Sequence, residues 1–384
     1  MIDHYQPFLF PFFSFHSSVP SPLVTRYYYW SWEDGLWDLL RAKKVEKGST
    51  LLVPNFYCSD VIENMRVHGY TVVTYRLDQH FQVKQQTLQN SIRKYHPAVV
   101  VLFHACGMTN PVVNKKTYIE RITKKSILLE DCVHQLLDPS VVKPVNDSHF
   151  LMDSLRKVSP FYGSFLYGTK KGMQFQQTSK RLSLYTMKTS FLYVLFRGIL
   201  QAAHIFKKPS LALFAHEQLL KRHDTIIGDG IAHQGMPLTA WMMQWMNREK
   251  LERVKREQVK WYEHMLTPIY KKSSPFYRIK IKRTDFGKLH VYPVGMKKKA
   301  DKELLDFLKE KDIIVFPKFA DSEWAKKRDV LFFPLGFHMD KNKIKIIAKT
   351  LLSLKTGEYK QAKVPVKSIS PHLLVRAAEL ILSF

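Results

Sequence analysis

The first half of the chain alternates short apolar runs with longer amphipathic segments, and this pattern limits the fold more than any other feature of the sequence. Between residues 30 and 168, the apolar runs are rich in β-branched and aromatic residues, and segments of helical length such as 60–67 and 115–124 separate them. Runs that are apolar throughout predict a mostly parallel sheet covered by helices on both faces. The predicted strands are residues 50–54, 71–75, 98–103, 126–130, 150–154 and 165–168.

The second half of the chain has a different pattern. Residues 175–230 are basic and aromatic and predict helices without alternating strands. One long helix is predicted over residues 237–266, where Trp241, Trp245 and Leu251 recur at roughly helical spacing. It leads into a second α+β unit, with predicted strands at 277–282, 288–294 and 313–316 and helices at 301–311 and 341–354.

These patterns predict an α/β protein with a large domain and a smaller α+β domain at its C-terminal side. The predicted parts are an N-terminal aromatic arm (1–25), a large domain (26–236), a linking helix with the small domain (237–355), and a C-terminal tail (356–384). In the tail, Ser370 and Pro371 suit the start of a last apolar helix.

The chain of 384 residues is strongly basic, with 60 Lys and Arg against 33 Asp and Glu and a net charge of +27. This excess predicts attraction to nucleic acid, to an anionic membrane face, or to phosphorylated or nucleotide-linked substrates. No nucleic-acid reading motif accompanies the charge, so we expect no specific nucleic-acid partner. The three cysteines, Cys58, Cys106 and Cys132, lie in apolar surroundings without CxxC spacing, which favours reduced thiols in the cytoplasm and no metal site.

Two apolar segments raise the question of membrane contact. Residues 1–15 lack a basic leading segment and contain Pro7 and Pro11, so we expect no cleaved signal peptide. Residues 191–206 fall short of the ~20 residues of a spanning helix and contain Arg197, so we expect no transmembrane helix. The segment 189–206 fits either a helix lying flat on an anionic membrane at its inner face or a helix that covers the sheet or a dimer interface; we favour the second because the segment lies inside the body of the chain.

His104, Asp131 and Lys157 each lie at or just after the end of a predicted strand. Ligands of open parallel sheets bind beyond the carboxyl ends of the strands, so these side chains are expected at one edge. Each also has a simpler interpretation: His104 as a hydrogen-bonded interior histidine, Asp131 as a turn residue and Lys157 as a solvated lysine of a basic loop. Cys132 is expected in the core.

Five segments of the first half, in order and spacing, resemble the large domain of the DegT/DnrJ/StrS family of sugar aminotransferases, which depend on pyridoxal phosphate (PLP). The family has the aspartate aminotransferase fold, fold type I. The later segments 246–266, 292–319 and 329–351 are similar to its linking helix, small domain and closing segment, so the resemblance covers roughly residues 25–355. The five segments are LLVPNFYC (51–58), TVVTYRLD (71–78), VVVLFHACG (99–107), LLEDCVHQ (128–135) and SLRKVSP (154–160).

The resemblance implies PLP as the cofactor and a role for specific residues around it. Lys157 would hold the coenzyme aldehyde as a Schiff base and later move protons, and Asp131 would pair with the pyridine nitrogen. His134 would lie near the coenzyme hydroxyl. Ser154 would contact the coenzyme phosphate, with Arg156 beside it as an anion partner.

Further positions follow from the same resemblance. Tyr57 would stack over the coenzyme ring, where Cys58 could not, and His104 would belong to the wall of the substrate pocket. Ser31 begins the helix at which the family grips the phosphate, but this chain continues with Trp32 and Glu33 where the family has a glycine step.

A second departure lies further along the chain. Near the family's Asn-x-Arg segment, which reaches the partner subunit's site, this chain has only His233 and Gln234.

The resemblance therefore predicts an aminotransferase that moves an amino group from a donor amino acid to a keto-sugar, nucleotide-linked, in polysaccharide or glycan biosynthesis. It also predicts a cytoplasmic homodimer. The alternative is a relative that has lost catalysis and keeps the fold as a binding or scaffolding module, with peripheral membrane contact. Trp32 and Glu33 are the residues that favour this alternative, because they weaken the expected phosphate site.

Overall fold

The computed structural model describes residues 22–157, 159, 161–206, 208–223, 230–313, 315, 317 and 319–355. Its main element is a seven-stranded sheet with the strand order β1-β7-β6-β5-β4-β2-β3. The five strands from β6 to the edge strand β3 pair in parallel, whereas β7 and β1 pair antiparallel at the other side. The strands are β1 (Val24–Tyr29), β2 (Thr50–Pro54), β3 (Thr71–Tyr75), β4 (Val99–Phe103), β5 (Ile127–Asp131), β6 (His149–Met152) and β7 (Ser164–Thr169).

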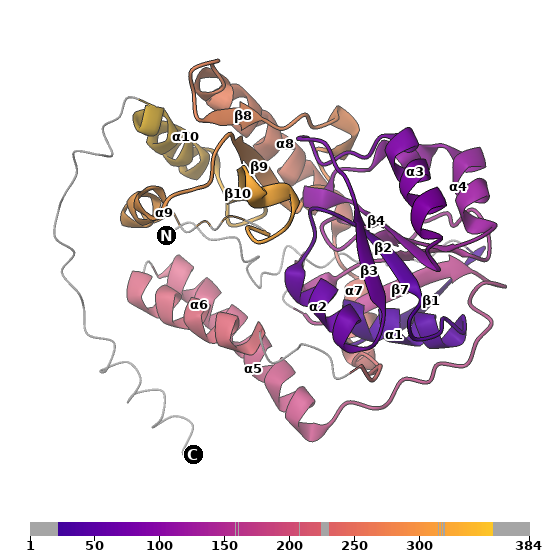
Figure 1. Ribbon diagram of the computed structural model, residues 1–384. Coiled ribbons are helices and arrows are strands. Elements are labelled where there is room, and N and C mark those ends of the chain that lie inside the picture. The colour runs from indigo at the N-terminus through magenta and orange to yellow at the C-terminus, as the bar shows by residue number, and fades with distance from the viewer. Residues whose placement is uncertain are drawn as a thin grey trace.

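Helices cover both faces of this sheet, as Figure 1 shows. The reversal of strand order at β2 and β3 places α3 and α4 on one face and α1 and α2 on the other, because crossovers between parallel strands are right-handed. Strands β2, β4 and β5 are buried almost throughout, as a doubly covered sheet requires. The helices are α1 (Trp32–Ala42), α2 (Ser59–Val67), α3 (Gln85–Tyr95) and α4 (Lys116–Thr123).

The rest of the described chain forms a helical hairpin and a smaller antiparallel sheet with the order β10-β9-β8. The hairpin is α5 (Leu184–Ile205) and α6 (Pro209–His223). The later elements are α7 (Pro237–Gln244), α8 (Arg248–Leu266), β8 (Phe276–Arg278), β9 (Val291–Met296), α9 (Lys302–Glu310), β10 (Asp329–Pro334) and α10 (Lys341–Lys355). Short 3₁₀ turns are η2 (Ala105–Gly107), η3 (Pro111–Asn114), η4 (Leu155–Lys157), η6 (Thr267–Ile269), η7 (Arg283–Asp285) and η8 (Trp324–Lys326).

The predicted mostly parallel sheet is confirmed, and its six predicted strands correspond to β2 to β7 with ends that differ by at most two residues. Strand β1 was not predicted. It is an edge strand whose residues between Val24 and Tyr29 are only partly buried, so it lacks the continuous apolar signal of the central strands. Strand β10 was not predicted as a strand either.

The single helix predicted over residues 237–266 is wrong, because the structure has two helices there. Helix α7 ends before Trp245, and Asn247 starts α8 by accepting the N–H of Lys250 with its side chain. The predicted strand at 277–282 is shorter and earlier in the structure, as β8, and the next lies two to three residues later, as β9.

Two further predictions concern segments that the structure covers only in part or not at all. Of the strand predicted at 313–316, the structure describes residues 313 and 315 only. The C-terminal helix after residue 370 and most of the aromatic arm lie outside the described residues.

The small sheet is attached to the large one at the carboxyl ends of the parallel strands. The N–H of His290 donates to the Cys106 carbonyl at 2.9 Å, and the N–H of Trp324 donates to the Asn55 carbonyl at 3.0 Å. Both acceptors lie in loops that follow strands of the large sheet, after β4 and β2. The loops that would carry a ligand site are therefore also the loops that hold the second half of the chain.

Among the described residues, no helix has the combined length and apolar character needed to cross a membrane.

Gly107 lies at the junction between the two sheets, and its replacement by alanine tests how tightly that junction is packed. Its φ is +97°, and an added Cβ would lie 2.5 Å from the His134 carbonyl oxygen and 2.7 Å from the Leu289 Cα. We expect Gly107→Ala to lower the free energy of unfolding by at least about 3 kcal/mol, because backbone strain and overpacking add together. Gly48 is the matched control: its φ is +87° with no atom within 4 Å of the added Cβ, so Gly48→Ala should cost only about 1 kcal/mol. Equal losses in urea unfolding would contradict the tight junction.

Candidate active site

The ends of three neighbouring parallel strands bring the predicted site residues to one edge of the sheet. In the strand register, Phe103 pairs with Asp131, and Asp131 pairs with Met152. The first residue after β4 is His104, and the turn that carries Lys157 begins three residues after β6. The strand register therefore places these three residues at one edge of the sheet, and their common role in a site stays a prediction.

Asp131 is the last residue of β5 and is almost completely buried. One carboxylate oxygen accepts the hydroxyl hydrogen of Tyr57 at 2.5 Å, and the other accepts the N–H of Val133 at 3.1 Å. Burial raises the pKa of Asp131 to about 6, although the hydrogen bond from Tyr57 acts in the opposite direction. A cation at this position would favour the ionised form, so the residue suits a protonated ring nitrogen.

Tyr57 is fixed between aromatic rings and Asp131. Its ring meets Phe103 at 5.3 Å and Trp32 at 6.4 Å, both edge to face. Burial raises the pKa of Tyr57 well above its usual value, so the hydroxyl keeps its proton and acts as a donor to Asp131. The structure thus places Tyr57 at the predicted site; its stacking over a coenzyme ring stays a prediction.

The loop after β6 brings two basic residues to the site. Lys157 is half-buried in η4, and its charge counteracts the burial that raises the pKa of the Cys58 thiol, so the two side chains lie near each other. Burial also raises the pKa of Glu33, and the charge of Arg156 is the main influence that opposes it. Ser154 is buried at the start of the same loop. The loop therefore approaches the start of α2 and the start of α1.

At the start of α1, the side chains of Ser31 and Asp34 make hydrogen bonds to each other and to nearby backbone N–H groups. The Ser31 hydroxyl oxygen accepts the N–H of Asp34 at 3.1 Å and donates to the Asp34 carboxylate at 2.6 Å. The other Asp34 oxygen accepts the backbone N–H of His233 at 2.9 Å. Ser31 is thus a helix cap in the structure, and its predicted contact with a coenzyme stays a prediction.

Trp32 adds a donor at the same place that sequence reasoning missed. The indole N–H of Trp32 is buried and has no hydrogen-bond acceptor among the described residues. A buried donor without an acceptor costs free energy, so the Trp32 indole N–H is available to an acceptor that reaches the start of α1; the indole N–H of Trp37 on the same helix is in the same position. Trp32 contacts the Tyr57 ring, which connects this donor to the Asp131 end of the site.

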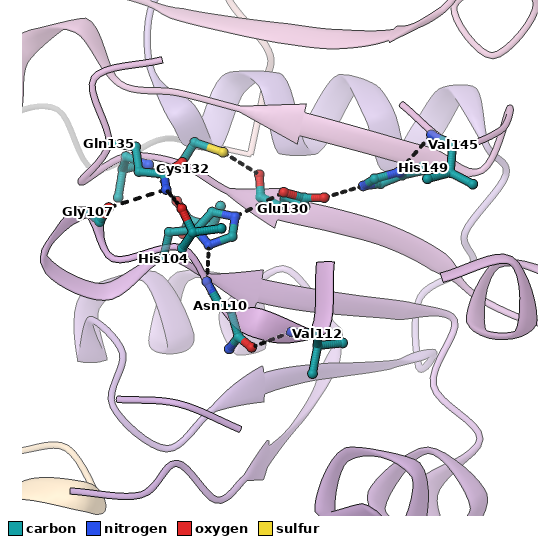
Figure 2. A network of polar contacts seen from close by, with 12 residues as sticks. His104, Gly107, Asn110, Val112, Glu130, Cys132, Gln135, Val145 and His149 are labelled. Atoms are coloured by element: carbon teal, nitrogen blue, oxygen red, sulfur yellow. Dashed lines mark hydrogen bonds and ion pairs between the residues drawn. The ribbon is translucent and has the colours of Figure 1, made fainter. Parts of the chain in front are cut away.

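His104 belongs to a hydrogen-bond network around Glu130, shown in Figure 2. Its Nδ1 accepts the N–H of Asn110 at 3.0 Å, and its Nε2 lies 2.9 Å from Glu130. The Nε2 of His149 lies 2.7 Å from the other Glu130 oxygen. Both histidines therefore donate to the carboxylate. His104 matches the interior, hydrogen-bonded interpretation; its place in the pocket wall stays a prediction.

Glu130 and Asp131 are neighbours on a strand, so their side chains point to opposite faces of the sheet. Burial would raise the pKa of Glu130, but the hydrogen bonds from His104 and His149 lower it to about 2. Sequence reasoning missed Glu130 and His149. The signal was present, since an acidic residue inside an apolar strand requires a buried partner.

The same network includes three neighbouring residues whose side chains are of the types that bind metal ions. The ligand atoms of His104, Glu130 and Cys132 lie within 4.8 Å of one another. Both Glu130 oxygens already accept hydrogen bonds from histidines, and burial raises the pKa of the Cys132 thiol well above its usual value. The group is thus satisfied as a hydrogen-bond network.

His134 joins the site to the small sheet. Its Nδ1 accepts the N–H of Cys106 at 3.2 Å, and its ring stacks on His290 at 5.4 Å and on Phe319 at 6.1 Å. The predicted contact of His134 with the coenzyme hydroxyl stays a prediction. His290 and Phe319 were not predicted, because they come from the distant second half of the chain.

Comparison with solved structures identifies the fold. A protein named as a sugar aminotransferase from Streptococcus pneumoniae, in its PMP form, is 12% identical with a TM-score of 0.61 and covers 93% of this chain and 100% of its own. The fold is that of the PLP-dependent aminotransferases of fold type I.

Two further structures with this fold are similar over most of their length. A DegT DnrJ EryC1 StrS aminotransferase from Brucella abortus is 11% identical with a TM-score of 0.54 over 86% of each chain. DesI, solved in the presence of its TDP-sugar product, is 13% identical with a TM-score of 0.53 over 88% of this chain and 82% of its own. No protein-family model and no curated protein matches the sequence.

The Glu130 network makes a testable prediction about stability and pH. The folded-state pKa of about 2 lies below the ordinary value of 4.5, so the stabilisation from Glu130 is present above pH 4.5 and is lost as the pH falls toward 2. We expect Glu130→Gln to lower the free energy of unfolding by about 3 kcal/mol at pH 6 and by much less at pH 2.5. Glu63→Gln, at an exposed residue, is the control and should change little at either pH. A Glu130→Gln effect that stays constant with pH in denaturant titrations would contradict the assignment.

Proposed function

We propose that this protein is a PLP-dependent aminotransferase that transfers an amino group from an amino acid to a keto-sugar. The single observation that carries the proposal is the buried Asp131 carboxylate at the end of β5, on the sheet edge that also carries Lys157 in the loop after β6. An acid that holds a ring nitrogen and an amine that holds an aldehyde are the two groups that this chemistry requires.

The residues present fit PLP at both of its ends. At one end, Asp131 is a buried carboxylate whose raised pKa of about 6 would be offset by a cationic ring nitrogen. At the other, the Trp32 indole N–H lacks an acceptor within the part of the chain that the structure describes, and Arg156 is close enough to Glu33 to influence its pKa. Ser154 and Ser31 would each add a hydroxyl, and the Ser31 hydroxyl also caps the start of α1. When bound, PLP withdraws electrons from the carbon that carries the amino group.

Each residue of the proposed site would then have a separate role. Asp131 would keep the ring nitrogen protonated, and the Tyr57 hydroxyl would hold the Asp131 carboxylate in place. The Nζ of Lys157 would anchor the cofactor and move a proton at the substrate carbon. His134 would orient the cofactor from its position between Cys106 and His290. The packed rings of Trp32, Tyr57 and Phe103 would exclude water from the Asp131 side.

The nature of the substrate follows from similarity and charge. The DesI structure was solved with a TDP-sugar product, and we propose a nucleotide-linked keto-sugar as acceptor here as well. Such a substrate carries negative phosphates, and the chain carries a net charge of +27 that would attract it. We further propose a cytoplasmic homodimer that acts in polysaccharide or glycan biosynthesis.

A second candidate function is a binding or scaffolding protein that has lost catalysis. Glu33 at the start of α1 favours it, because a carboxylate near the phosphate position opposes anion binding unless Arg156 neutralises it. The indole N–H of Trp32, which has no acceptor in the described ranges, favours the enzyme instead. The two candidates differ in whether the purified protein takes up PLP.

The role of Lys157 is tested by absorbance and mass. Purified protein supplied with PLP should show visible absorbance and, after borohydride reduction, a mass increase localised to the peptide that contains Lys157. Lys157→Ala should lose both signals because the amine that forms the bond is removed. Lys170→Ala, at an exposed lysine after β7, is the control and should keep them. Absence of both signals in the unmodified protein would favour the scaffolding function.

The role of Trp32 is tested by PLP affinity. Trp32→Phe keeps an aromatic ring but removes the indole N–H, and a hydrogen bond to a charged acceptor contributes about 1.5–3 kcal/mol. We expect the Kd for PLP to rise roughly 10-fold or more in fluorescence or equilibrium-dialysis titrations. Trp37→Phe is the matched control, since Trp37 is also buried on α1 and has no acceptor among the residues that the structure covers, but packs against His68 and Tyr70 instead. Equal Kd values for both variants would show that Trp32 does not bind the phosphate.

A further inference from the structure

Helices α5 and α6 form a hairpin with a small core of its own. Figure 1 shows the pair extending away from the strands of the large sheet. Their shared core continues to Trp30 and Tyr162, which attach the hairpin to the large domain. The buried residues of this core on the two helices are Tyr193, Phe196, Leu200, Ala203, Ala212, Ala215 and Leu219.

The opposite face of α5 is also apolar, and it is exposed. The exposed fractions are 82% for Leu184, 38% for Met187, 68% for Phe191 and 43% for Leu195. These residues recur every three or four positions, so they form one stripe along the helix, on the side away from Tyr193. We call these four residues the outer stripe of α5.

The outer stripe is not an ordinary scatter of exposed apolar residues. Half of the twelve large hydrophobic side chains exposed in the described part of the chain lie on the hairpin, between residues 184 and 213. Besides the outer stripe, these include Phe206, which is 71% exposed after the end of α5. A helix that is apolar on both faces requires a second apolar surface to cover it.

The charges around the outer stripe identify the kind of surface. The segment 154–216 contains ten Lys and Arg residues and no Asp or Glu. Lys180, Arg181 and Lys188 are exposed before and along the stripe, and Lys208 is exposed after it. A second copy of this chain would place like charges against each other, whereas an anionic surface would attract them.

Apolar side chains on one face of a helix, with lysines beside them, are the pattern of helices that lie in the plane of a membrane interface. Helix α5 has 22 residues and is about 33 Å long, enough for several side chains to enter the bilayer together. We propose that the outer stripe of α5 docks this protein on an anionic lipid bilayer, with Leu184, Phe191 and Leu195 inserted among the acyl chains and the flanking lysines at the lipid phosphates. This docking goes beyond the proposed aminotransferase function and does not depend on it.

The test is flotation of the full-length protein with vesicles. Vesicles of phosphatidylcholine with 30% phosphatidylserine should bind the protein at least 10-fold more strongly than vesicles of phosphatidylcholine alone, and 0.5 M NaCl should weaken this binding. The double variant Phe191→Ser with Leu195→Ser should bind the anionic vesicles at least 10-fold less. The matched control is Val67→Ser with Ile346→Ser, which removes two exposed apolar side chains elsewhere and should bind like the unmodified protein.

Three outcomes would overturn the proposal. The first is the absence of binding to anionic vesicles. The second is salt-sensitive binding that the Phe191→Ser and Leu195→Ser substitutions leave unchanged, since the general positive charge would then account for it. The third is a change from dimer to monomer in the double variant by light scattering without any loss of vesicle binding, which would assign the stripe to a second copy. Circular dichroism of each variant confirms that the comparison is made between folded proteins.

Discussion

Two adjacent buried carboxylates, Glu130 and Asp131, lie at the end of the central strand β5, and the arrangement around them depends on how each charge is compensated. Because neighbours on a strand point to opposite faces, the two have separate partners. Two histidines donate to Glu130 and lower its pKa to about 2. Burial raises the pKa of Asp131 to about 6, although the Tyr57 hydroxyl and a backbone N–H donate to its carboxylate and act in the opposite direction. The charge of Glu130 is therefore compensated by its hydrogen bonds, whereas an additional cation would stabilise the ionised form of Asp131. This asymmetry favours the Asp131 face as the place for a cationic ligand.

The hydrogen bonds around Glu130 also hold in place the loops that lie near Asp131. His104, which donates to Glu130, accepts the N–H of Asn110 and so fixes the loop after β4. That loop includes Cys106, whose N–H donates to His134 and whose carbonyl accepts from His290 of the second half of the chain. Two sets of hydrogen bonds, joined by the short covalent step from His104 to Cys106, thus connect Glu130 with the junction of the two sheets. The Glu130 network acts on the proposed site by positioning it.

The sequence was sufficient for the parallel sheet, because central strands such as the one predicted at residues 98–103 are continuously apolar and have a strong signal. It was also sufficient to place Asp131 and Lys157 at one edge, since strand ends in a parallel sheet converge. It missed the edge strand β1, whose half-buried side chains resemble those of a loop. It missed the end of α7, because Trp241 and Trp245 continue the helical spacing while Asn247 starts a new helix. It also missed His290 and Phe319, because only the folded chain brings them to His134.

The electrostatic character of the chain connects the proposed site with the hairpin. Residues 154–216 contain no Asp or Glu. This segment begins with Ser154, Arg156 and Lys157 of the proposed site and continues through α5. A positive potential over such a segment would attract anionic substrates and anionic lipids alike, but charge alone holds neither in a defined position. In both proposals, position would come from different groups: from Asp131 and the Trp32 indole N–H in the proposed site, and from the apolar outer stripe on the hairpin. The same excess of positive charge is thus compatible with both proposals, substrate binding at the site and lipid binding at the hairpin, because different local groups would position each ligand.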